Sequence, residues 1–176
     1  MDAYVLEHIV VDNDIRADLF LPLTITRLQQ ATTMEREAIL AVQLRDIDRV
    51  DELYKELLIS WSAGGMLGEG VPLQERVITE WAAVGIACIL MPLYTGLRIL
   101  QVTQIGDGFD YWVGDDRWEY ALEVSGTVTG NLIHRHAAKV RQLQRNPYDV
   151  DGYVAVTRFA SLEAILSFNR CEEPAE

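Results

Sequence analysis

The stretch from residue 108 to residue 126 constrains the fold of this chain more than any other. It reads GFDYWVGDDRWEYALEVSG, in which two apolar runs, residues 109–113 and 118–124, flank the four residues Gly-Asp-Asp-Arg. Glycine and aspartate tolerate the backbone conformations of tight turns, and aromatic and β-branched residues favour strands. The stretch therefore predicts a β-hairpin.

Each arm of the predicted hairpin carries one acid in an apolar context, Asp110 on the first arm and Glu123 on the second. Charged side chains are rarely buried unless they are paired or bind a metal. We therefore expect both carboxylates to point into one cleft and to hold a divalent cation. The alternative is that both acids lie near strand ends and face water.

Length and charge limit the class of protein. The chain has 176 residues, of which 49% are hydrophobic, and a net charge of −12. This length suits one domain with a substantial core. The negative charge argues against indiscriminate nucleic-acid binding, but it is compatible with an enzyme that has a locally basic groove.

The cysteines and the apolar runs indicate a cytoplasmic protein. Cys88 and Cys171 lie far apart in different contexts, so neither a disulfide framework nor a metal motif is expected. The N-terminus is acidic and lacks the basic start of a signal peptide. Residues 81–94 are strongly apolar but shorter than the roughly 20 residues of a membrane span, so we expect a buried core helix and no membrane association.

The first 64 residues predict an N-terminal strand and helix extension. We expect strands over residues 3–11 and 19–25, the second one irregular because of Pro22, and a helix over residues 34–44. A second helix is predicted from Asp48, because the following apolar residues recur at helical spacing: Val50, Leu53, Tyr54, Leu57, Leu58 and Trp61. These residues are expected to cap a core; the alternative is a surface for a protein partner.

Residues 74–170 predict a mixed sheet with helices on both faces. Residues 64–72 resemble a linker, and residues 74–93 predict a long buried helix that carries Glu80. A strand over residues 97–105, the hairpin, a helix over residues 132–145 and a strand over residues 152–159 follow, whereas residues 162–168 fit either a strand or a helical turn. The fold class is therefore α/β (α+β).

This order of elements, with an acid on each arm of the hairpin, resembles the core of the PD-(D/E)XK nuclease superfamily, which has the restriction-endonuclease-like fold. The matching residues are Gly108-Phe109-Asp110 and Leu122-Glu123-Val124-Ser125, and Glu80 matches an acid on the first core helix. The resemblance covers about the last 100 residues. It implies a metal-dependent nuclease in which Asp110 and Glu123 bind Mg²⁺ or Mn²⁺ and Glu80 is an auxiliary acid.

The chain departs from the family at one position. The resemblance implies a catalytic lysine two residues after the second acid, but Ser125 stands there. Lys139 is the only lysine in residues 74–176, so we expect it to replace the missing charge from the following helix. The spacing between Lys139 and Glu123 leaves open whether the two side chains meet.

The helix predicted over residues 132–145 is a candidate nucleic-acid surface. Residues 132–158 carry five basic residues and two acids in this acidic chain. Arg135, Arg141, Gln142 and Ser125 are the candidate substrate-binding residues. The alternative is a solvated face whose cations pair with the N-terminal acids. His134 and His136 diverge on a helix, so we interpret them as surface or cap residues and not as metal ligands.

Other chemistries lack their motifs, because the sequence contains no phosphate-binding P-loop, no dinucleotide fingerprint and no GxSxG elbow. The aromatic residues of the hairpin are expected to pack in the sheet, with stacking on bases as the alternative.

Two hypotheses of different class remain. The first is a nuclease that acts on DNA or RNA through Asp110, Glu123, Lys139 and Glu80. The second is a catalytically inactive module of the same fold that binds a protein partner through the N-terminal extension, as a regulatory or defence-system component. An unrelated α/β domain is a third reading, and a homodimer is left open.

Overall fold

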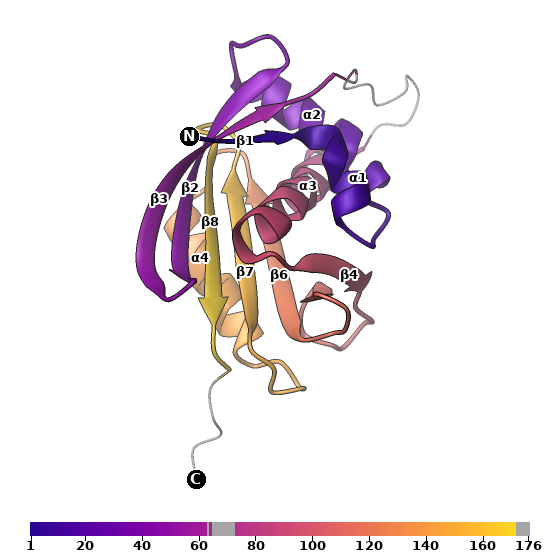
Figure 1. Ribbon diagram of the computed structural model, residues 1–176, viewed down its shortest axis with the longest axis vertical. Coiled ribbons are helices and arrows are strands. Elements are labelled where there is room, and N and C mark those ends of the chain that lie inside the picture. Colours follow the sequence, from indigo (N-terminus) through magenta and orange to yellow (C-terminus); the bar gives the residue numbers. More distant parts are fainter. Residues whose placement is uncertain (63, 65–72, 172–176) are drawn as a thin grey trace.

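The protein is built on one mixed β-sheet with helices on both faces. The computed structural model describes residues 1–62, 64 and 73–171, and eight strands run in the order β1-β3-β2-β8-β7-β6-β5-β4. Helix α3 lies on one face of the sheet and α4 on the other (Figure 1). This arrangement confirms the predicted mixed sheet with flanking helices.

The described part of the chain contains the following elements in order: β1 (Asp2–Val5), η1 (Leu6–His8), α1 (Ile9–Asp12), η2 (Ala17–Leu19), α2 (Leu21–Ala31), β2 (Glu37–Ile47), β3 (Val50–Ser60), α3 (Glu75–Thr95), β4 (Arg98–Val102), β5 (Tyr111–Gly114), β6 (Tyr120–Thr127), α4 (Leu132–Leu143), β7 (Gly152–Arg158) and β8 (Glu163–Asn169).

The C-terminal elements follow the order expected from the sequence. Strands β4, β5 and β6 form an antiparallel meander, and α4 then connects β6 to β7, which is parallel to β6. Residues 163–169, whose structure the sequence left open, form β8, antiparallel to β7. The predicted linker, residues 64–72, lies outside the described residues except for Gly64.

The two helices predicted within residues 34–61 are wrong, because these residues form the long antiparallel pair β2–β3. The buried side chains of β2 alternate, as a strand requires: Ala38, Leu40, Val42 and Leu44. The helical spacing in β3 was misleading because three of its apolar residues, Val50, Leu53 and Tyr54, are exposed. Exposed apolar residues can complete a helical spacing in the sequence even though they belong to no buried helix face.

The turn between β2 and β3 explains why Asp48 resembled a helix cap. Ile47 pairs with Val50, so Asp48 and Arg49 form a two-residue loop, and both have positive φ, 51° and 65°. Positive φ at both central residues is characteristic of a type I′ hairpin turn, in which aspartate is favoured. Aspartate is also favoured at a helix N-cap, so its presence alone does not separate the two structures.

The strand predicted over residues 3–11 is wrong beyond Val5, and the strand predicted over residues 19–25 is wrong throughout. Strand β1 ends at Val5 and short helical turns follow, whereas residues 21–25 begin α2. Pro22 lies in the first turn of α2, where proline is tolerated because the missing N–H would lack an intrahelical partner in any case.

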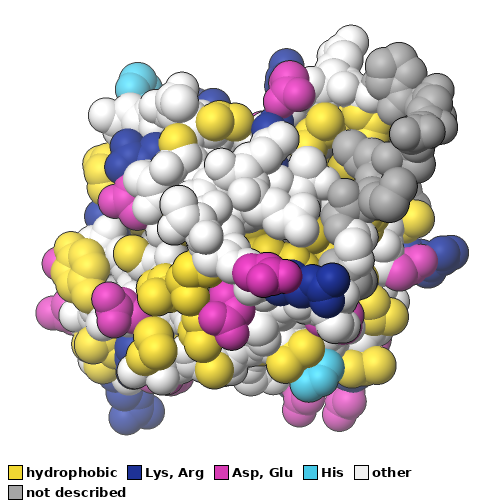
Figure 2. Space-filling model, turned by 90° about the horizontal axis from the view of Figure 1, so that it is seen from above, with side chains coloured by type: hydrophobic (Ala, Val, Ile, Leu, Met, Phe, Trp, Pro, Cys, Tyr) yellow, Lys and Arg dark blue, Asp and Glu magenta, His cyan; other side chains and the backbone are white. Residues whose placement is uncertain are grey.

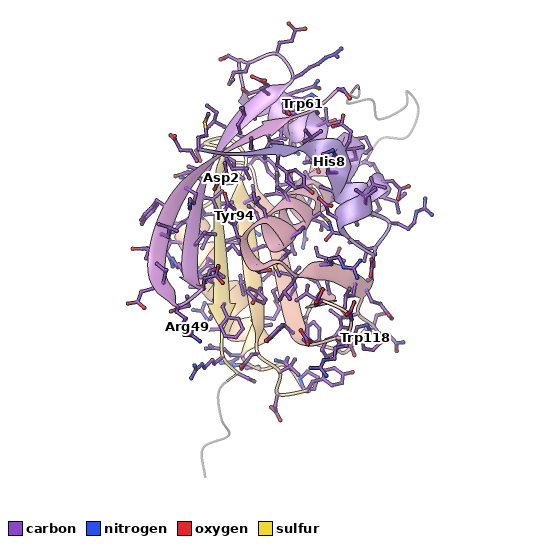
Figure 3. All side chains as sticks on the ribbon, in the orientation of Figure 1. Asp2, His8, Arg49, Trp61, Tyr94 and Trp118 are labelled. Carbon is purple, nitrogen blue, oxygen red and sulfur yellow. The ribbon has the colours of Figure 1, made fainter. Side chains whose placement is uncertain are left out.

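The N-terminal strands belong to the same sheet as the C-terminal elements. Strand β2 pairs in parallel with β8, and a single hydrophobic cluster contains side chains from β2, β3, α3 and β6. Asp2 of β1 accepts a hydrogen bond of 3.1 Å from the Tyr94 hydroxyl near the end of α3 (Figure 3). The N-terminal region is therefore packed onto the core.

Helix α3 is the central core element. It is long and apolar enough to cross a bilayer, but 67% of its most apolar window is buried inside the protein. It crosses α2 so closely that a Cβ added at Gly85 would lie 1.9 Å from the Thr24 hydroxyl oxygen. The buried core helix predicted from the sequence is therefore confirmed. Acidic and basic side chains are interspersed with hydrophobic ones on the face seen from above (Figure 2).

Replacing Arg49 with glycine should stabilise the protein, because glycine adopts positive φ without the steric cost that a Cβ carries. We expect an increase of roughly 0.5–1 kcal/mol in the free energy of unfolding, measured by urea denaturation. Glu52→Gly, within β3, is the control and should destabilise the protein. An Arg49→Gly variant less stable than the wild type would contradict the turn.

Candidate active site

The candidate active site is built on β6, which is covered on both faces. Residues 121–127 are all buried, and Leu122 and Val124 pack into the cluster that contains α3. Alternate residues of a strand point to opposite faces, so Ala121 and Glu123 point toward α4. The Glu123 side chain is 0% exposed, although a buried carboxylate is unfavourable without a partner.

Asp110 lies beside Glu123, directly before β5. Its backbone N–H donates to the carbonyl of Leu122 at 3.1 Å, and its Oδ2 accepts the Val124 N–H at 2.8 Å. These bonds hold the Asp110 carboxylate across the strand pair from Glu123. The structure thus brings the two predicted metal ligands together.

Lys139 and Gln142 of α4 contact the same buried carboxylate. Lys139 Nζ lies 2.7 Å from Glu123 Oε2, and Gln142 Nε2 lies 2.5 Å from Oε1. Residues three apart share one face of a helix, which is why α4 presents both side chains to β6. A lysine from α4 therefore meets the second acid, although position 125 carries serine.

The environment of Glu123 perturbs its ionisation. Burial, and then the neighbouring Asp110, raise the pKa of Glu123 to about 8, although the Lys139 ammonium acts in the opposite direction. Glu123 therefore retains its proton to a higher pH than an ordinary glutamate does, even with the Lys139 ammonium beside it. An additional cation at this position would favour the ionised form of Glu123.

Glu80 of α3 contacts residues near the end of β6 and Arg135 of α4. Its Oε2 accepts the Gly126 N–H at 3.2 Å, and its Oε1 is 3.5 Å from the Ser125 hydroxyl and 3.8 Å from Arg135 Nη1. Arg135 also donates to Ser125 Oγ at 3.0 Å. These partners give Glu80 a positioning role at the end of β6.

A glycine allows α3 to bring Glu80 to β6. A Cβ at Gly126 would lie 2.6 Å from the backbone oxygen of Thr79 and 2.9 Å from Ala83 Cβ. Real Cβ atoms are not found so close to a backbone oxygen, so a larger residue would push α3 away from the strand. The contact between Glu80 and the Gly126 N–H depends on this close approach.

Two hollows lie along this edge of α4. The first, of about 380 Å³, is lined by Ser125, Asn131, His134, Arg135, Ala138, Lys139 and Gln142. The second, of about 350 Å³, is lined by Glu75, Arg76, Thr79, Glu80, Gly126, Thr127, Val128 and Arg135. They share Arg135. Arg141 is exposed and lines neither hollow, so it stands apart from the other predicted substrate-binding residues.

Asp110 and Glu123 are the residues that could hold a magnesium-like ion, with substrate and water as its remaining ligands. No group of three or more His, Cys, Asp and Glu side chains among the described residues is arranged to hold a metal. Mg²⁺, however, is commonly bound through one or two carboxylates together with waters and substrate phosphates. Asp110 and Glu123 provide such a pair of hard oxygen donors. Lys139 is a competing cation at Glu123.

The two histidines of α4 have different environments, and the prediction that both are surface or cap residues is wrong for His136, which is buried within the helix. Its Nε2 lies 2.7 Å from the Ser167 hydroxyl of β8, and burial, followed by the charge of Arg45, lowers its pKa to about 4. His134 is exposed. The helical spacing of the sequence could have predicted that His136 is buried, because His136 falls on the same helix face as Leu132 and Leu143.

Comparison of the chain with protein-family models, with curated proteins and with solved structures finds no match. The function proposed below therefore rests on the geometry of the site.

The pH dependence of stability should report the Glu123 proton. In the folded protein the pKa of Glu123 lies above its ordinary value of 4.5. The proton that Glu123 holds therefore stabilises the folded state fully below pH 4.5, and this contribution is lost as pH rises through about 8. In Glu123→Gln this loss is absent. We expect the difference between the two unfolding free energies to change by roughly 4 kcal/mol across the interval. Urea denaturation at several pH values measures it, and parallel curves would contradict the raised pKa.

Proposed function

We propose that this protein is a metal-dependent nuclease that hydrolyses phosphodiester bonds of DNA or RNA, related in design to the PD-(D/E)XK enzymes. The observation that carries the proposal is the 2.7 Å contact between Lys139 Nζ and the buried Glu123, whose neighbour is Asp110. It supports a lysine that has moved from position 125 to α4. The order of α3, the β4–β5–β6 meander, α4 and β7 also supports the resemblance.

In this proposal Asp110 and Glu123 hold Mg²⁺ or Mn²⁺. When bound, such an ion polarises the scissile phosphate and lowers the pKa of an attacking water. Lys139 is placed to orient that water and to stabilise negative charge that develops on the phosphate, since its ammonium already lies at the acid pair. Gln142 holds the other oxygen of Glu123 and so orients the carboxylate.

The substrate backbone fits the α4 side of the site. Arg135 lines both hollows and has a side chain that is 39% exposed, so it can contact a phosphate while it remains near Glu80. Ser125 and Gln142 add hydrogen-bonding groups to the same wall. This local basic surface offsets the overall negative charge of the chain, which otherwise opposes nucleic-acid binding.

The second candidate is a catalytically inactive module that binds a protein. The specific observation in its favour is that Lys139 and Arg135 already pair with Glu123 and Glu80, while Ser125 stands at the family's lysine position. The partner surface would be the N-terminal hairpin, where Ile39, Leu53 and Tyr54 are exposed, and a second copy of the chain is one such partner. The free, buried thiol of Cys88 supports a cytoplasmic location for either function.

Metal binding separates the two candidates. Titration calorimetry of the wild type with Mg²⁺ and Mn²⁺ should show binding that strengthens as pH rises toward 8, because the ion requires ionised Glu123. Asp110→Ala should remove the signal. A silent wild-type trace for both ions would contradict the nuclease and favour the inactive module.

Removing the lysine should affect cleavage without abolishing metal binding. In Lys139→Met we expect retained or tighter Mg²⁺ binding, since a competing cation is lost, and cleavage of single-stranded and plasmid DNA slower by roughly 10²–10³-fold. Arg145→Met is a matched control at an exposed position just beyond α4 and should cleave like the wild type. If the wild type, Asp110→Ala and Lys139→Met cleave DNA equally fast, this site is not the source of the cleavage.

A further inference from the structure

A third hollow, of about 280 Å³, has a lining of a different chemical kind. Aromatic and amide side chains dominate it, and its lining contains no lysine or arginine: Gln101, Val102, Thr103, Gln104, Asp107, Trp112, Trp118 and Tyr148. It lies where β4, β5 and the segment after α4 meet. Trp118 projects at the end of the molecule opposite to Trp61 (Figure 3).

The aromatic rings of this hollow form an open platform. Trp118 stacks on Trp112 with a centroid distance of 5.6 Å and an interplanar angle of 13°, and Tyr148 meets Trp112 at 5.5 Å and 65°. Trp112 rests on the hydrophobic cluster beneath α4, so the platform has a rigid base. Trp118 and Tyr148 are nevertheless 55% and 51% exposed. Their free surfaces are available to a flat ligand.

One residue that lines the hollow contacts the backbone of a candidate active-site residue. Thr103, one of its lining residues, donates its backbone N–H to the Asp110 carbonyl at 3.1 Å, and its hydroxyl lies 3.0 Å from the same oxygen. Trp112 packs on the hydrophobic cluster that contains Leu132 and Leu143 of α4, and Glu123 contacts Lys139 of the same helix, so Trp112 and Glu123 lie on the same face of the sheet. A chain whose phosphate lies at the carboxylates can therefore place a neighbouring base on the platform.

The chemistry of the lining suits a base and not a phosphate. Asp107 would repel a phosphate, and both its oxygens are occupied, by the Tyr148 hydroxyl at 2.7 Å and the Gln104 N–H at 2.8 Å. A neutral base avoids this repulsion. The exposed amides of Gln101 and Gln104 can donate to and accept from base edges, and every base has a face that stacks on tryptophan.

We propose that this hollow binds one unpaired nucleobase, so that the substrate is single-stranded DNA or RNA. Paired bases inside a duplex cannot offer a free face to Trp118 and Tyr148. The inference rests on the proposed nuclease function and names its substrate class.

Binding without cleavage tests this inference separately from catalysis. The probe is a fluorescently labelled 12-residue oligothymidylate, measured by anisotropy in EDTA, beside an oligonucleotide of equal length and charge that lacks its bases. Wild type should bind the oligothymidylate about tenfold more tightly than the abasic strand. Trp118→Ala should bind both strands equally, and Trp118→Phe should keep most of the preference. Trp81→Ala removes an exposed tryptophan of α3 and should match the wild type.

Two results would overturn the inference. One is equal binding of the two strands by the wild type, including failure to bind either. The other is an unchanged preference in Trp118→Ala. Because the metal titration uses no nucleic acid, calorimetric Mg²⁺ binding lost in Asp110→Ala would leave the nuclease proposal standing in either case.

Discussion

The contact between Glu123 and Lys139 is the interaction on which the candidate site depends. Strand β6 is buried by α3 on one side and α4 on the other, so an acid within it loses its hydration and needs a cation or a proton. The fold supplies an ammonium from α4, and burial together with Asp110 still keeps the pKa of Glu123 near 8. Lys139 alone therefore does not offset the cost of ionising the buried Glu123, and a further cation would favour the ionised form.

Close packing on the other face of β6 supports this arrangement. Gly85 lets α2 approach α3, and Gly126 lets α3 approach β6 until Glu80 reaches the strand's backbone. Glu80 then holds Arg135, which lies between the two hollows beside α4. The positions of Glu80 and Arg135 therefore depend on the close approach of α3 to β6 that Gly126 permits.

The sequence predicted much of the C-terminal half and little of the N-terminal half. Clear turn chemistry at residues 114–117 and a capping Asn131 marked the hairpin and α4, and both are present. In β3, exposed apolar residues imitated a helical period, and Asp48 fits a helix cap as well as a type I′ turn. Local patterns could not reveal that β2 pairs with β8 more than one hundred residues later.

The sequence by itself determined which groups were available for chemistry: two acids in apolar stretches of the hairpin, a serine two residues after the second acid, and one lysine on the following helix. Only the tertiary structure decided that these groups meet, because the position of α4 over β6 depends on packing between distant elements. The same is true of Tyr148, which joins the two tryptophans only because the chain after α4 returns to the hairpin. Side-chain identity is local information, whereas the distance between Lys139 and Glu123 is a property of the whole fold.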